Sequence, residues 1–412
     1  PSVFRDVASL KTRTSRELRE LGRLPHPMIR RRGDRGFEPI SWEDALDLIA
    51  FRIDRDKPDR TFLYLTSRGI PNETYYVAQK AMRVIGTNNV DNAARVCHSP
   101  STVALKEAIG VGATTCSYRD LIGTDLITFF GSNVAKNQPV LMKYLYHAKK
   151  AGTKIVTVNP YREPGMDAYW VPSDLESAMF GTKISDHFVQ VTSGGDRAFL
   201  HGTLKALHEA SAIDRSFIDA HTHGWDDLQA VLEATSWETI EREAGVGRNE
   251  IEQYADLVAK AERAVFVWGM GITQHADGED NVRAIVDLAL SRGFIGREGC
   301  GVMPIRGHSG VQGGAEMGAY TNVLPGGTAL TEASAATLSS AYGFNVPSQP
   351  GITTPAMLAA ARRGEIDVLL AVGGNFREVM PDPAASDDAL GAVPLRVHID
   401  IVPSSQMLTD PA

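Results

Sequence analysis

The sequence predicts an α/β protein with more than one doubly wound, mostly parallel sheet. Short apolar, β-rich runs recur along the chain, and amphipathic helical stretches lie between them. Near-continuous apolar runs are typical of parallel strands that helices cover on both faces. Their alternation with helices favours the α/β class. Several of the runs also end in small polar loops, and open α/β sheets bind ligands at the carboxyl ends of their strands.

The predicted strands follow one another with helices between them. The runs are residues 61–65, 126–130, 154–158, 265–268, 368–372 and 396–401. The clearest amphipathic helices are residues 140–150 and 281–292. A shorter strand-like run, residues 188–191, leads into a helix predicted at 198–210.

Four of these strands end in small polar loops, and three of these loops contain glycine. The loops carry Gly131 and Asn133, Asn159 and Arg162, Gly269 to Gln274, and Gly374 and Asn375. Glycine lets the backbone approach a phosphate, and the following helix N-terminus favours negative charge. Any one of these loops could be a plain turn. Together they predict an extended nucleotide-like ligand, or two of them.

The loop at residues 192–196 opens the helix predicted at 198–210. From spacing alone, Asp196 is best interpreted as a helix N-cap that accepts a backbone N–H. The alternative is that Asp196 accepts hydrogen bonds from the edge of a nucleobase.

Residues 299–314 form the densest glycine segment and carry Arg306, His308 and Gln312. We expect neither a helix nor a central strand here, because glycine is unfavourable in both. The spacing matches neither the phosphate loop nor the dinucleotide glycine motif. The segment is interpreted either as a ligand-wrapping loop or as a lid or crossover.

The composition excludes several functions. Of the 412 residues, 43% are hydrophobic and 22% are charged, and the net charge is −8. This charge argues against nucleic-acid binding, which relies on basic surface. No apolar stretch reaches the roughly 18 residues that span a bilayer, so we expect no membrane insertion.

The three cysteines, Cys97, Cys116 and Cys300, form neither a disulfide framework nor a CxxC pair. A zinc knuckle or an iron–sulfur cluster therefore cannot be built from this chain alone. The sparse cysteines fit a reducing, cytoplasmic location. Because the chain starts at Pro1 and stops just after a strand-like run, we expect a piece of a longer protein.

Cys97 is the residue with the most chemical potential. It lies beside His98 and close in sequence to Arg95, and positive neighbours favour a thiolate, which is a nucleophile or a soft metal ligand. Adjacent residues diverge in direction, so His98 is poorly placed to deprotonate Cys97. Metal ligation is favoured, with a cofactor such as a pterin dithiolene supplying the other ligands. The alternative, a small buried hydrophobic residue, is assigned to Cys116 and Cys300.

Two stretches closely resemble the molybdopterin oxidoreductase family, and within it the formate dehydrogenase catalytic subunit. The first includes Ser67-Arg68-Gly69, Asn72-Glu73-Thr74, residues 85–91 and Arg95-Val96-Cys97-His98-Ser99-Pro100-Ser101. The second is residues 304–313, and the likeness is collinear from Ser41 to Gln406.

The resemblance implies two doubly wound, mostly parallel-sheet domains around a bis(molybdopterin guanine dinucleotide) cofactor that holds molybdenum or tungsten. Cys97 falls at the position of the metal ligand, His98 at the active-site histidine and Arg306 at the active-site arginine. In formate dehydrogenases that arginine binds the substrate carboxylate, and the histidine assists with the proton.

The resemblance also implies two sets of cofactor contacts. The set for one guanine dinucleotide is Gly131, Asn133, Asn159, Arg162, Gly194 and Asp196. The set around the other pterin dinucleotide is Gly269, Met270, Gly271, Gln274, Gly307, His308, Gly374, Asn375 and Asp400. For Asp196, this replaces the interpretation as a plain cap.

The chain departs from the family in three ways. It has no cysteine-rich segment for the 4Fe–4S cluster expected in the parent protein, and no C-terminal β-barrel-like cap. It also has His308 where formate dehydrogenases carry glutamine, and the run from Arg306 to Ser309 resembles a less characterised branch. The predicted domains are a remnant at 1–60, a first cofactor-binding domain at 61–96 with 310–412, and a second at 97–309.

The predicted function is formate oxidation to carbon dioxide, with two electrons passed to molybdenum or tungsten. The expected partners are a small anionic substrate and an electron-transfer subunit. One alternative is an oxo-transfer reductase that uses the same cofactor on another small substrate. The other is an inactive cofactor-binding fragment.

Overall fold

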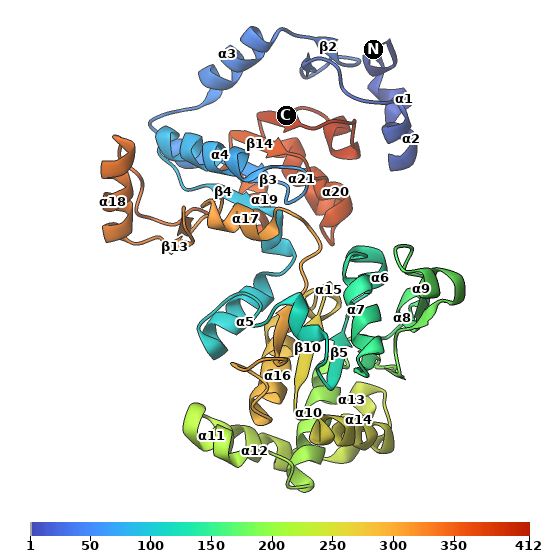
Figure 1. Cartoon of the computed structure of the whole chain (residues 1–412). Coiled ribbons are helices and arrows are strands. Elements are labelled where there is room, and N and C mark those ends of the chain that lie inside the picture. Colours follow the sequence, from blue (N-terminus) through green and yellow to red (C-terminus); the bar gives the residue numbers. More distant parts are fainter. Residues whose placement is uncertain (1) are drawn as a thin grey trace. The chain divides into compact units, whose positions relative to one another are not determined.

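The computed structural model describes residues 2–412 and consists of two compact units (Figure 1). The first unit comprises the chain up to Arg95 together with His308–Ala412, and the second is Val96–Gly307. Each unit contains its own parallel sheet.

The first unit has a four-stranded parallel sheet in the order β15-β14-β3-β4. Its strands are β3 (Thr61–Leu65), β4 (Val90–Asn92), β14 (Val368–Val372) and β15 (Leu395–Ile399). One face packs Phe62 and Leu369 against Met357 and Leu390 of α19 (Thr354–Arg362) and α21 (Pro383–Ala392). The other face packs Leu63 against Met82 of α4 (Asn72–Ile85). The two-sided cover explains why the central strands β3 and β14 are mainly apolar.

The second unit has a five-stranded parallel sheet in the order β11-β10-β5-β6-β9. Its strands are β5 (Leu126–Phe130), β6 (Lys154–Val158), β9 (His187–Val189), β10 (Ala264–Trp268) and β11 (Gly301–Pro304). The larger core lies between this sheet and helices that include α5 (Ser99–Ile109), α10 (Asp196–Glu209), α14 (Arg248–Lys260) and α16 (Gly278–Ser291). The opposite face is covered by α7 (Leu141–Lys150). Helix α5 packs along α16 (Figure 1).

The remaining elements are short or peripheral. In the first unit they are α1 (Val7–Lys11), α2 (Ser15–Glu20), β1 (Met28–Ile29), β2 (Glu38–Pro39), α3 (Trp42–Arg52), α17 (Val311–Glu316), β12 (Val323–Leu324), β13 (Thr328–Ala329), α18 (Glu332–Tyr342) and α20 (Phe376–Val379). In the second they are α6 (Val134–Asn137), α8 (Pro164–Asp167), β7 (Ala168–Tyr169), α9 (Leu175–Phe180), β8 (Thr182–Lys183), α11 (Arg215–His221), α12 (Trp225–Ala234), α13 (Trp237–Ala244) and α15 (Met270–Thr273). Among residues 2–412, no helix has the length and apolar character to cross a membrane.

The predicted α/β class with parallel sheets is confirmed. The strand predicted at 396–401 ends at Ile399, because Asp400 Oδ1 accepts the N–H of Ile401 in a turn. The helix predicted at 281–292 begins earlier, at Gly278, and the helix predicted at 198–210 begins at Asp196.

The prediction that residues 299–314 contain no helix is wrong. Residues 301–304 form the edge strand β11, and Val311–Glu316 form α17. Packing requires glycine at the helix start and within the helix: a Cβ on the N-cap residue Gly310 would lie 2.5 Å from the hydroxyl of Tyr75, and one on Gly313 would meet Asn72. Close contact between backbone and neighbours therefore outweighs the entropic cost of glycine in a helix.

Candidate functional site

The sheet of the second unit reverses its strand order between β5 and β10, where open α/β sheets bind ligands. The loops after these strands touch through their backbones, and Gly271 donates its N–H to Gly131 O at 3.0 Å. A Cβ on Gly131, which has φ +53°, would lie 2.7 Å from the backbone of Gly271. Glycine is therefore required on both loops, and backbone atoms form the floor between the two strand ends.

The loop after β10 also holds the segment that contains Cys97. Thr273 Oγ1 donates to the carbonyl of Cys97 at 2.8 Å, and Gln274 Nε2 donates to that of Val96 at 3.2 Å. The Sγ of Cys97 lies 3.1 Å from the Sδ of Met270. Of the predicted site residues, Cys97, Met270 and Gln274 are thus brought together at the reversal point.

The environment of the Cys97 thiol differs from the expectation. Burial raises the pKa of Cys97 to about 11, and the positive charge of Arg306 opposes that rise only in part. Arg95, the predicted neighbour, instead pairs with Asp91 at 3.2 Å. The prediction that nearby charge holds the free thiol as thiolate is therefore wrong, because desolvation penalises the charged form more than Arg306 favours it.

His98 is the N-cap residue of α5 and is only 1% exposed. Its Nδ1 lies 3.1 Å from Ser101 Oγ, one turn along the helix. Ser101 in turn accepts a hydrogen bond of 2.9 Å from Nε1 of Trp268, the last residue of β10. His98 and Cys97 therefore contact different groups although they are adjacent.

Arg306 follows β11 and is attached to the same helix. Its Nη2 donates to Thr102 Oγ1 at 3.0 Å and to the carbonyl of Gly112 at 2.9 Å. Ser101 and Thr102 are consecutive, so the first turns of α5 hold both His98 and Arg306. The second unit thus places a thiol, an imidazole and a guanidinium around one helix end.

The other predicted contacts of the second unit lie along the same sheet edge. Asn133 caps α6 by accepting the N–H of Lys136 at 3.3 Å, and Asn159 Nδ2 donates to the Ser132 carbonyl at 3.2 Å. Arg162 pairs with Asp167 at 2.9 Å.

Asp196 is the most unusual group at this edge. The helix cap is Gly195, preceded by Gly194 at φ +85°, so the cap interpretation of Asp196 is wrong. Asp196 is only 3% exposed, and among residues 2–412 its Oδ1 has no hydrogen-bond partner. Burial raises the pKa of Asp196 to about 6, opposed by the nearby His275. A buried polar atom without a partner indicates a missing ligand or water.

Gly374 and Asn375 follow β14, at the first unit's own reversal point between β3 and β14, whereas Asp400 follows the edge strand β15. A Cβ on Gly374, which has φ +81°, would lie 2.8 Å from the Tyr64 ring. Asn375 Nδ2 donates to Ser405 Oγ at 3.0 Å, and Asp400 follows β15.

His308 belongs to the first unit, whereas Gly307 is the last residue of the second. Burial lowers the pKa of His308, and the charge of Arg68 lowers it further. Arg68, which follows β3, therefore lies close enough to His308 to disfavour its protonated form.

Three supporting residues were not assigned roles from the sequence: Ser101, Thr102 and Trp268. Ser101 lies in the family motif, but its contact with His98 depends on helix geometry. The link between residues 101 and 268 arises only from tertiary packing.

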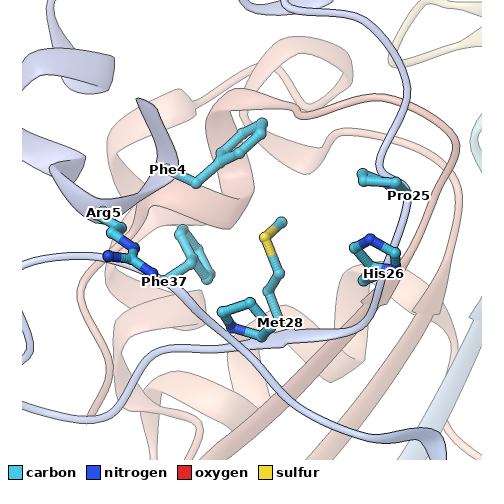
Figure 2. Close-up of a pocket in the computed structure, with 7 residues that line it drawn as sticks. Phe4, Arg5, Pro25, His26, Met28 and Phe37 are labelled. Carbon is cyan, nitrogen blue, oxygen red and sulfur yellow. The ribbon is translucent and has the colours of Figure 1, made fainter. Parts of the chain in front are cut away.

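A separate cavity of about 330 Å³ lies in the amino-terminal part of the first unit (Figure 2). Its walls are mainly apolar, with Phe4, Met28 and Phe37 facing inward beside Arg5 and His26. None of the predicted site residues lines it. Within the described part of the chain, no group of three or more His, Cys, Asp or Glu could hold a metal ion without a cofactor.

The chain is similar to proteins of known family. An uncharacterised oxidoreductase of Mycobacterium tuberculosis is 35% identical over 401 residues, covering 95% of this chain and 50% of the relative. Formate dehydrogenase H of Escherichia coli is 33% identical over 378 residues, covering 90% and 50%. The chain therefore spans about half the length of the curated relatives it matches.

A solved structure and a family model agree on the fold. Acetylene hydratase from Pelobacter acetylenicus superposes with a TM-score of 0.69 at 18% identity, covering 98% of this chain and 55% of that one. The model of the molybdopterin oxidoreductase family matches residues 23–401. The chain therefore belongs to the molybdopterin oxidoreductase family, and the family implies a molybdenum or tungsten pterin cofactor.

Proposed function

We propose that this chain provides the cofactor-binding and substrate-binding part of an enzyme that oxidises formate to carbon dioxide. The observation that carries the proposal is the arrangement around α5. Cys97 precedes the helix, His98 caps it, and Arg306 is hydrogen-bonded to it close enough to act on the Cys97 thiol. The likeness to formate dehydrogenase H supports the choice of substrate.

The residues present fit a pterin dinucleotide cofactor. Gly131 and Gly271 leave a backbone floor at the reversal point, which suits a phosphate-bearing ligand. The unpartnered Oδ1 of Asp196 suits the N–H donors of a guanine edge. Cys97 offers the soft sulfur that molybdenum or tungsten takes as a protein ligand. When bound, such a cofactor supplies the acceptor for the two electrons of formate oxidation.

Arg306 is proposed to bind the carboxylate of formate. A guanidinium recognises a carboxylate through parallel N–H donors, and its plane must be oriented for this. The two hydrogen bonds from Nη2 to Thr102 and Gly112 anchor the guanidinium beside α5. His98 is proposed to assist with the proton that the oxidation releases, because it is held at the same end of α5.

The proposal extends to the parts of the protein beyond this chain. The cofactor is proposed to be the bis(guanine dinucleotide) form, contacted by the two sets of residues predicted above. A 4Fe–4S cluster and an electron-transfer subunit would carry the electrons away. A cytoplasmic location is part of the proposal, since all three cysteines are free thiols. Residues 61–96 with 310–412, and 97–309, remain the proposed cofactor-binding domains.

A second candidate is an oxo-transfer reductase with the same cofactor. It is favoured by His308, which stands where formate dehydrogenases carry glutamine. The uncharacterised oxidoreductase from Mycobacterium tuberculosis shows that chains of this similarity need not be named for formate. His98 directly after Cys97 argues against this candidate, because nitrate-reducing members usually lack that histidine.

The test uses the full-length protein, purified and analysed for molybdenum and tungsten by mass spectrometry. We expect near-stoichiometric molybdenum or tungsten. With formate as substrate, the enzyme should reduce an artificial electron acceptor. With nitrate as substrate, it should not oxidise a reduced electron carrier. Cys97→Ala should abolish formate oxidation, whereas Cys116→Ala, which alters a thiol outside the site, should retain it. Absence of both metals, or activity with nitrate alone, would contradict the proposal.

A further inference from the structure

We propose that Ser101, itself oriented by Trp268, is a positioning residue that holds His98 in the neutral tautomer with its proton on Nε2. The use of this tautomer in catalysis rests on the proposed function. The assignment of the tautomer rests on the hydrogen bonds alone.

Trp268, Ser101 and His98 form a hydrogen-bond relay. The relay starts at Trp268, whose side chain is fixed. Trp268 closes β10 and is paired in register with Phe130 of β5 and Pro304 of β11. It is 0% exposed and lies in the main core of the unit. An indole N–H can only donate a hydrogen bond. Ser101 Oγ, 2.9 Å away, must therefore be the acceptor.

The hydrogen of the Ser101 hydroxyl is then available for His98. Among residues 2–412, the Ser101 hydroxyl has no acceptor within hydrogen-bond distance other than the His98 ring. His98 Nδ1 lies 3.1 Å from Ser101 Oγ. A neutral imidazole that accepts at Nδ1 carries its hydrogen on Nε2.

Burial gives the relay its strength. His98, Ser101 and Trp268 are all buried, so little water competes for these hydrogen bonds. The other tautomer would place an N–H on Nδ1 facing the hydroxyl. The hydrogen of the Ser101 hydroxyl would then have no acceptor among residues 2–412.

The consequence for the reaction is that His98 has a hydrogen-bond donor at Nε2. Together with the guanidinium of Arg306, this gives the end of α5 two groups that favour an anion such as formate. Ser101 sets one of them and Thr102 holds the other. Two consecutive hydroxyl residues would thus position both groups that are proposed to act on the substrate.

The experiment measures the tautomer directly. The chain is labelled with 15N-histidine, and a long-range 1H–15N spectrum is recorded, with the His98 signals identified by their loss in His98→Gln. We expect a pyridine-type Nδ1 and a pyrrole-type Nε2. Ser101→Ala should shift both signals toward a mixture of tautomers, Ser101→Thr should restore them, and Trp268→Phe should have an intermediate effect.

The matched control is Ser99→Ala, which removes a hydroxyl from the same turn. Among residues 2–412, no hydrogen bond joins Ser99 to the His98 ring, so this variant should leave the His98 signals unchanged. Circular dichroism establishes that each variant is folded. A protonated Nδ1 in the unmodified chain, or identical spectra for Ser101→Ala and Ser99→Ala, would overturn the proposal.

A second measurement separates this inference from the proposed function. In the full-length enzyme, Ser101→Ala should lower kcat about 10- to 100-fold. It should leave KM and metal content nearly unchanged, and Ser101→Thr should recover much of the loss. A variant that loses metal and kcat together would overturn the positioning role. If formate is not oxidised but the nitrogen signals are as expected, the proposed function fails and the tautomer assignment stands.

Discussion

The two units have the same sheet architecture but different chemistry. Each has a parallel sheet with one reversal of strand order, and each lines that reversal with glycine: Gly131 and Gly271 in the second unit, Gly374 in the first. The second unit adds a thiol, an imidazole and a guanidinium, all of them at α5. The first unit adds amides, a carboxylate and the pair of Arg68 and His308. The shared architecture suits a dinucleotide, and the helix end at Cys97 makes one unit reactive.

The sharpest way to break this comparison is Arg306→Ala in the full-length enzyme. Loss of a hydrogen-bonded charge partner for formate should lower kcat/KM about 100- to 1000-fold, or ~3–4 kcal/mol, mainly through KM. Metal content should change little, because Arg306 is anchored to Thr102 and Gly112. Steady-state kinetics and metal analysis check this. Arg363→Ala, at an exposed position of the first unit, is the control, and it should leave the formate KM within severalfold.

Equal losses of metal and activity in Arg306→Ala would show that Arg306 supports the cofactor instead of the substrate. The proposed difference between the two units, with the substrate site in the second unit and cofactor contacts in the first, would then lose its main support.

Asp196→Asn tests whether the second unit sacrifices stability to bind a ligand. The folded-state pKa of Asp196 is raised to about 6 from 3.8, so the folded chain binds more protons between these values. Stability present below pH 3.8 is therefore lost as the pH rises through about 6. The neutral amide should remove this cost and stabilise the cofactor-free chain at pH 7 by about 1–3 kcal/mol.

The same variant should lower the molybdenum or tungsten content of the full-length protein, because the acceptor for the guanine edge is lost. Urea unfolding and metal analysis measure the two effects. Asp226→Asn, at an exposed position of α12, is the control and should change neither. A destabilised Asp196→Asn chain would mean that the carboxylate has a partner in the folded protein.

The sequence was sufficient to predict the bounds of strands that are buried on both faces. Residues 126–130 and 154–158 form strands with those bounds, since apolar runs between turn residues admit little else. The helix with Gly313 and Gly314 could not be predicted, because its cause is the side chain of Asn72 and Tyr75 far away in sequence.

Only the residues of the candidate site that belong to the family motifs could be predicted from the sequence. Cys97, His98 and Arg306 were found through the resemblance, whereas Trp268 had no local signal and acts through Ser101. The pKa of Cys97 was predicted in the wrong direction, because sequence neighbours do not reveal burial.

His398 provides a stability test in the first unit. The residue is partly exposed, but among residues 2–412 its two ring nitrogens are buried and have no partner. Burial, and to a lesser degree Arg396, lowers the pKa of His398 to about 3 from 6.5. Between these values the unfolded chain binds more protons, so stability falls as the pH drops below about 6.5, by at most about 1.4 kcal/mol per pH unit.

His398→Leu should remove most of this dependence, and urea unfolding at pH 7, 6 and 5 measures it. His223→Leu, at an exposed position of the second unit, should keep the slope of the unmodified chain. If the unfolding free energies of both variants depended equally on pH, the pH dependence would come from a group other than His398.

The smallest effect that we expect is the difference in unfolding free energy between alanine variants of the glycines at the two reversal points. Gly131→Ala should cost about 2 kcal/mol, because it combines a positive φ with a backbone contact at 2.7 Å that cannot relax. Gly374→Ala should cost about 1 kcal/mol, since its contact is the ring of Tyr64, which can move. Gly152→Ala has φ +92° and nothing within 4 Å, so it isolates the backbone cost. Urea unfolding ranks the variants, and a cost for Gly374→Ala equal to that of Gly131→Ala would mean that Tyr64 is as rigid as the backbone floor of the second unit.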